Sequence, residues 1–153
     1  MNSMMMVMRD LGHRLGLVLD LTRGAVALTD VDGQVWQIEP DEVGGNLLIH
    51  CQLVPWHAGR GDERQLAHWM SVNADVARMK GAWLALQRDQ GRIALYMLIP
   101  AALLTATTLD HALANLVLLR RELAATAMTT NQHGTTDWAA MTAGRGYTGG
   151  LSA

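Results

Sequence analysis

The residues of this chain best suited to metal binding or nucleophilic catalysis are His50, Cys51 and His57. Imidazole and thiolate groups are common zinc ligands, and a thiolate beside a histidine base is the reactive pair of cysteine enzymes. His50 and Cys51 are adjacent in the alternating segment NLLIHCQLV, however, and adjacent residues of a strand point to opposite faces. We therefore expect Cys51 to be a small core residue. A small metal-binding protein or Cys/His enzyme of α+β fold remains the alternative function.

The acidic residues offer no second site. Asp30, Asp32, Asp41 and Glu42 form a loose cluster, but the calcium-loop pattern with its terminal glutamate is missing. No paired-cysteine motif or HExxH spacing supplies metal ligands elsewhere. The sequence therefore predicts no enzymatic activity, no metal site and no cofactor.

Composition favours a protein partner. The 153 residues fit one domain, and 50% of them are hydrophobic while 17% are charged, a larger apolar share than a small monomer needs. The net charge is −2, the isoelectric point is about 6.3, and Lys80 is the only lysine. The chain therefore lacks the excess of basic residues that is typical of nucleic-acid-binding proteins. We expect oligomerisation or a protein ligand.

The chain also has the character of a cytoplasmic protein. A single cysteine cannot form an internal disulfide, and the start MNSMMMVMRD lacks a secretory signal pattern. No run reaches about 18 uninterrupted apolar residues, so we expect no membrane insertion.

The chemistry-bearing residues would be positioned by eight predicted elements. Apolar residues three and four apart predict helices, and alternating runs around Asp32-Gly33 and residues 89–91 predict two hairpins. The order is helix, three strands, helix, two strands and helix, an α+β class with an antiparallel twisted sheet packed with helices. The expected ranges are 4–15, 24–30, 34–39, 46–54, 62–80, 82–88, 92–99 and 107–125.

The C-terminal segment differs from the rest. Residues 126–153 are rich in Gly, Thr and Ala and show no apolar period. We expect an α+β domain over 1–125 and a flexible Gly/Thr-rich tail over 126–153. A third candidate function is a structural adaptor whose tail docks on a neighbour through Trp138 and Tyr147.

Tryptophans are the chief aromatic candidates for a protein contact, because the chain has five of them and no phenylalanine. Trp69 is the best interface candidate, since Leu66 and Met70 accompany it on a predicted helix.

With the elements in place, the chain resembles the class I type III secretion chaperones, the Tir-chaperone-like family of small bacterial cytosolic proteins. The resemblance covers residues 4 to about 125 and includes a helix-then-hairpin block with Asn73 and Gly81. The segments that carry it are LGLVLDL, DVDGQVWQIE, NLLIHCQLVP, ERQLAHWMSVNADVARMKGAWLALQRDQGRIALYMLIP and TATTLDHALANLVLLRRELA.

The resemblance implies a chaperone that binds the N-terminal segment of one or more secreted effectors and keeps it non-globular and secretion-competent, without ATP hydrolysis. The secretion-system ATPase is a further candidate partner. The resemblance also implies a homodimer formed through the second helix and the neighbouring strand. The predicted dimer residues are Leu66, Trp69, Met70, Asn73 and Trp83, and the predicted effector contacts are Leu15, Leu17, Val26, Leu28, Trp36 and Ile38.

Overall fold

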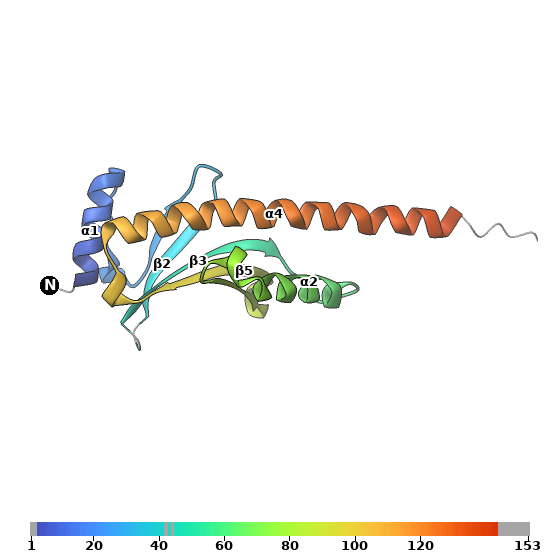
Figure 1. Ribbon diagram of the computed structural model, residues 1–153, viewed down its shortest axis with the longest axis horizontal. Helices are drawn as coiled ribbons and strands as arrows, with labels where there is room; N and C mark the ends of the chain where they lie inside the picture. The colour runs from blue at the N-terminus through green and yellow to red at the C-terminus, as the bar shows by residue number, and fades with distance from the viewer. Residues whose placement is uncertain (1–2, 42, 44, 144–153) are drawn as a thin grey trace, which may run out of the picture.

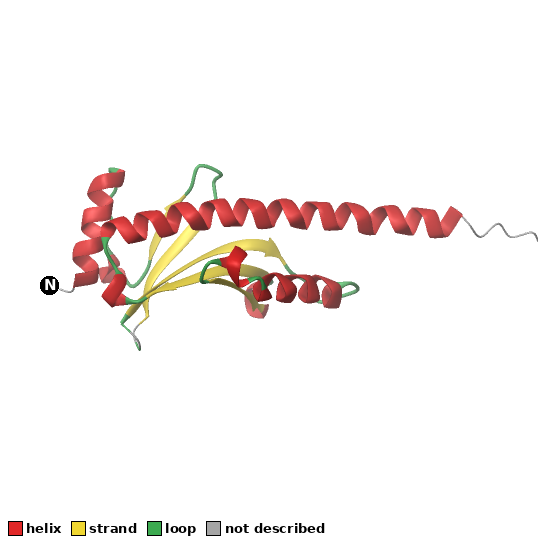
Figure 2. Cartoon of the chain, viewed as in Figure 1, coloured by secondary structure: helices red, strands yellow, loops and turns green. Residues whose placement is uncertain are grey.

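The structure of the protein is a computed structural model that describes residues 3–41, 43 and 45–143, with side chains described through residue 127 (Figure 1). Its helices and strands confirm the predicted α+β class (Figure 2). The helices are α1 (Ser3–Leu15), α2 (Asp62–Ala74), α3 (Val76–Met79) and α4 (Ala106–Ala143), and the strands are β1 (Val26–Thr29), β2 (Val35–Asp41), β3 (Asn46–Pro55), β4 (Ala82–Gln87) and β5 (Arg92–Ile99).

The five strands form one antiparallel sheet in the order β1-β2-β3-β5-β4, so β1 and β4 are its edges. Trp36 of β2 pairs with Cys51 of β3, which pairs with Leu95 of β5, which in turn pairs with Leu84 of β4. All four side chains are buried. Because directly paired residues share a sheet face, this row runs across the apolar face of the sheet.

Helices α4 and α1 cover this apolar face (Figure 1). Leu109, Leu116 and Leu123 recur every seven residues along α4, and each is at most 1% exposed. Met8 and Leu11 of α1 are fully buried in the same cluster. The core therefore lies between one face of the sheet and these two helices.

Gly12 lies in the last turn of α1, where the backbone that follows the helix comes close to it. The Leu17 N–H donates to the Gly12 carbonyl at 2.8 Å, and Gly12 is buried. A β-carbon at position 12 would lie 2.6 Å from the Leu17 carbonyl oxygen. A glycine at this position is what allows the chain to fold back against the helix.

The first hairpin is organised by Asp30. Its carboxylate accepts the backbone N–H groups of Asp32 and Gln34, and its second oxygen accepts the Trp36 indole N–H at 2.9 Å. Gly33 follows with a φ of 76°. The prediction of a hairpin at Asp32-Gly33 is confirmed, but its loop is longer than a two-residue turn because the Asp30 side chain binds several loop amides.

The predicted helix over 62–80 is divided in two. Helix α2 ends at Ala74, and the Asp75 carboxylate accepts the Arg78 N–H at 3.1 Å to begin α3. Gly61, not Asp62, precedes the first helical residue. Aspartate competes for nearby backbone amides, and this favours a helix boundary at Asp75.

Helix α4 continues past the sheet to Ala143, so the prediction that the last helix ends near 125 is wrong (Figure 1). Alanines at 124, 125, 127, 139, 140 and 143 have high helix propensity and favour helix at both ends of this extension. Trp138 lies within α4, whereas Tyr147 and the rest of 144–153 lie outside the described residues. The division into a domain over 1–125 and a tail over 126–153 stays a prediction. Across the described residues, no helix has both the length and the apolar character that a membrane span requires.

Candidate protein-binding surfaces

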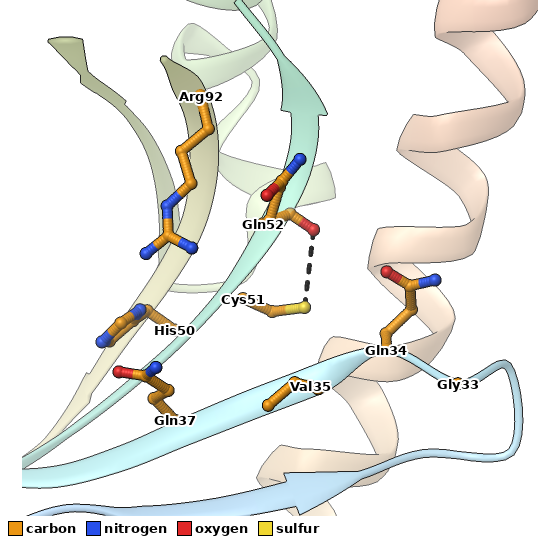
Figure 3. A pocket seen from close by; sticks show the side chains of 8 residues that line it. All are labelled: Gly33, Gln34, Val35, Gln37, His50, Cys51, Gln52 and Arg92. Carbon is orange, nitrogen blue, oxygen red and sulfur yellow. Dashed lines mark hydrogen bonds between the residues drawn. The ribbon is translucent and has the colours of Figure 1, made fainter. Parts of the chain in front are cut away.

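His50 and Cys51 occupy opposite faces of β3, as predicted from their adjacency. Figure 3 shows the side chains of His50 and Cys51 pointing away from each other. Cys51 belongs to the buried cluster, while the His50 ring stacks on Tyr96 with 5.1 Å between centroids. Burial raises the pKa of the Cys51 thiol, which disfavours a reactive thiolate. His57 is exposed after β3. The described residues bring together no group of three His, Cys, Asp or Glu side chains able to hold a metal ion, so the alternative function is not favoured.

The sheet face opposite α4 carries a row of rings. His50, Tyr96 and Trp83 pair across β3, β5 and β4, and the Trp83 and Tyr96 rings stack with centroids 5.7 Å apart. The Glu39 carboxylate lies 3.6 Å from the His50 Nε2 atom. Burial lowers the pKa of His50, although Glu39 acts in the opposite direction. Trp83 is 38% exposed, so this row ends at the protein surface.

A cavity of about 300 Å³ lies beside His50, the first ring of this row. Figure 3 shows the side chains that line it. At its border, the Gln87 amide donates to the Tyr96 hydroxyl, and the Arg92 Nε–H donates to the Gln87 oxygen. This network joins β4 to β5 and fixes the arginine side chain. The residues lining the cavity are Gly33, Gln34, Val35, Gln37, His50, Cys51, Gln52 and Arg92.

Helix α2 presents one buried and one exposed side. Trp69 is 3% exposed, whereas Met70 is 70% exposed. Asn73 is used within the protomer: its amide oxygen accepts the Leu84 N–H at 2.7 Å, and its amide N–H donates to the Leu84 carbonyl at 2.9 Å. Leu66 is partly buried. Of the predicted dimer residues, Met70 and Trp83 are therefore the most accessible.

The predicted effector contacts also divide into exposed and buried side chains. Leu15 and Leu17, at the end of α1, are 44% and 50% exposed. Val26, Trp36 and Ile38 are at most 9% exposed on the face under α1 and α4. Leu28 is partly buried. The structure therefore brings Leu15 and Leu17 to the surface, and it encloses the strand residues in the core.

Sequence reasoning did not single out several exposed apolar side chains. Val18 follows Leu17 and is 94% exposed, and Val76 is 75% exposed just after α2. The segment LGLVLDL over residues 15–21 has five apolar residues within seven, which is a signal for a surface of this kind. Arg92 and Gln87 were also missed, because their relation depends on strand register.

These features define an α+β protomer with a helix-covered sheet and exposed apolar side chains near α1 and α2. Exposed apolar side chains of this kind are typical of protein-binding surfaces. The sequence profile of the Tir chaperone protein (CesT) family matches residues 7–124, and the chain belongs to this family. The predicted resemblance to class I type III secretion chaperones is confirmed.

Several solved structures have a similar fold. The fold is similar to a chain of the ExsC-ExsE complex, with 25% identity, a TM-score of 0.64, and coverage of 77% of this chain and 88% of that chain. A chain of the HopA1-SchA chaperone-effector complex has 21% identity, a TM-score of 0.60 and coverage of 78% and 91%. A chain of the heterodimeric ExoU-SpcU complex from the type III secretion system of Pseudomonas aeruginosa has 18% identity, a TM-score of 0.59 and coverage of 75% and 93%. No curated protein matches this chain in a sequence search.

Proposed function

We propose that the protein is a cytoplasmic type III secretion chaperone without enzymatic activity. It binds the N-terminal segment of one or more secreted effectors and keeps that segment non-globular by mass action, without ATP hydrolysis. The family match over residues 7–124 carries this proposal. Two solved structures of similar fold, one of a chaperone-effector complex and one of a complex from a type III secretion system, support it.

The exposed apolar side chains at the end of α1 are the proposed effector contacts. Leu15, Leu17 and Val18 follow one another around the Gly16 turn, where φ is 69°. The β1 edge begins shortly after them and pairs only with β2. An extended segment added to this edge would gain main-chain hydrogen bonds, and its apolar side chains would cover the leucines.

Affinity purification from the native bacterium, followed by identification of the bound protein, tests the proposal. We expect a secreted protein whose N-terminal segment is sufficient for binding. Leu17→Asp should weaken capture about tenfold, because the exposed contact loses its apolar surface and gains a charge. His13→Asp, at an exposed position of α1, is the matched control and should retain binding. Enrichment of no secreted protein by the wild type would contradict the proposed function.

We also propose that the chaperone is a homodimer through α2 and β4. Met70 and Trp83 are exposed and apolar, and the chain has more apolar surface than its own core uses. Light scattering at micromolar concentration should give twice the protomer mass. Met70→Asp should shift the protein toward monomer, while Ser71→Asp, at the adjacent exposed position, should leave it dimeric. A wild-type monomer would contradict the dimer.

A further inference from the structure

Three side chains that line the cavity on the open sheet face carry hydrogen-bond donors without a described partner. Arg92 makes no ion pair with any described carboxylate, and its Nε–H is its only side-chain donor with a described acceptor, the Gln87 oxygen. The side-chain amides of Gln37 and Gln52 line the same cavity and have no described hydrogen-bond partner. A guanidinium and two amides at one hollow can donate to an oxygen-rich ligand.

The arginine is held in place before any ligand arrives. Gln87 accepts from Arg92 and donates to the Tyr96 hydroxyl, and the Tyr96 ring is itself stacked between His50 and Trp83. A side chain fixed in this way loses less conformational entropy on binding than a free surface arginine. The guanidinium therefore resembles a built anion-binding group more than a solvated surface charge.

The surrounding charges select the ligand class. Arg92 is the only formally charged residue among those that line the cavity. Glu39 lies 3.6 Å from His50 Nε2, and Arg120 of α4 donates its Nε–H to the Gln52 carbonyl at 2.9 Å. Glu39 repels a dianion such as phosphate more strongly than a single carboxylate, and the carboxylate matches the charge and the planar fork of one guanidinium. The cavity of about 300 Å³ accepts a carboxylate side chain.

We propose that this cavity binds one acidic side chain, Asp or Glu, of the extended secreted segment, with Arg92 as the anchoring residue and Gln37 and Gln52 as flanking donors. The inference rests on the proposed function, because that function identifies the secreted segment as the source of the acidic side chain. The pocket would fix the register of a segment that is otherwise held by sequence-tolerant apolar contacts. It lies on the sheet face opposite the one covered by α1 and α4, and so gives the segment a second point of attachment.

The test uses a small probe and needs no effector, so its failure is distinguishable from failure of the chaperone function. The intact protein, labelled with ¹⁵N-arginine, is titrated with N-acetyl-glutamate N-methylamide while the Arg92 Nε–H signal is followed by NMR. We expect a saturable shift of that signal. N-acetyl-glutamine N-methylamide, which lacks only the charge, should cause no shift. Equal shifts with both probes would overturn the proposal.

Two further probes separate other anions from an acidic side chain. N-acetylalanine carries a main-chain terminal carboxylate, and inorganic phosphate carries up to two charges at neutral pH. Both should bind more weakly than the glutamate probe. Tighter binding of either would refute the assignment to an acidic side chain.

Variants locate the site. Gln37→Glu places a carboxylate of the protein itself in the cavity, at an exposed position, and should abolish the shift without altering Arg92. Arg92→Gln should abolish probe binding, measured by the shift of a ¹⁵N-glutamine signal at Gln37 or Gln52. Arg88→Gln, at an exposed arginine of the neighbouring turn, is the matched control and should bind as the wild type does. Retained binding in Gln37→Glu would overturn the proposal even if Arg92→Gln failed to fold.

Discussion

The substitution Asn73→Ala tests whether Asn73 acts as a dimer contact or stabilises the edge strand β4 within the protomer. The Asn73 amide makes two hydrogen bonds to the backbone of Leu84, of 2.7 and 2.9 Å. Each bond contributes about 1 kcal/mol net, and alanine returns about 0.5 kcal/mol through its higher helix propensity. We therefore expect the free energy of unfolding to fall by about 1.5 kcal/mol. For a chain of this size, the melting temperature should drop by about 3 to 6 °C.

Urea denaturation at several protein concentrations measures this effect, since a dimer's apparent stability depends on concentration. Asn115→Ala, at an exposed position of α4, is the control and should change stability by less than about 0.5 kcal/mol. Asn73→Asp keeps the size of the side chain but loses the donor and places a charge at the Leu84 carbonyl, so it should be at least as destabilising. An unfolding free energy equal to that of Asn115→Ala, together with a change in elution volume, would refute the edge-covering role and favour the dimer contact.

Two other predictions concern the core and the open sheet face. Gly12→Ala should destabilise the protein by about 1 to 3 kcal/mol, because its β-carbon would lie 2.6 Å from the Leu17 carbonyl oxygen; Gly59→Ala, with nothing within 4 Å, should be nearly neutral by the same urea assay. Burial lowers the pKa of His50 in the folded protein, so the unfolded chain binds a proton at this residue more readily. The folded state therefore loses stability as the pH falls below the ordinary pKa of histidine. The urea midpoint should therefore fall less between about pH 7.5 and about pH 5.5 in His50→Gln than in the wild type, and an identical pH dependence would show that His50 does not titrate in this way.

The element order was readable because its signals are local. Alternation in NLLIHCQLV and the glycines at 33 and 91 act within a few residues, and the structure forms strands and turns there. The break at Asp75 was missed because one carboxylate competing for a nearby amide outweighs the helical period. The end of α4 was not predicted for a different reason. The Gly- and Thr-rich composition after residue 125 suggested flexibility, although the alanines there favour a helix.

The candidate surfaces were only partly predictable. Period-two patterning groups Val26, Trp36 and Ile38 on one sheet face, but it does not say what covers that face. The cover includes α4, about 70 residues later in the chain, together with α1, and all three side chains are buried in the shared core. Leu15 and Leu17 precede the sheet and remain exposed. Their role as effector contacts stays a prediction, as does the dimer role of the α2 residues.

By itself, the sequence determined the fold class, the core position of Cys51, and a family pattern over most of the chain, because these depend on the spacing of apolar residues and on local turn chemistry. The tertiary structure decided which apolar residues stay exposed and which polar groups meet. Arg92, Gln87 and Tyr96 form one network through the pairing of β4 with β5, and Asn73 reaches Leu84 across the sheet edge. Such contacts follow from strand register and helix placement, which are settled only when the whole core packs.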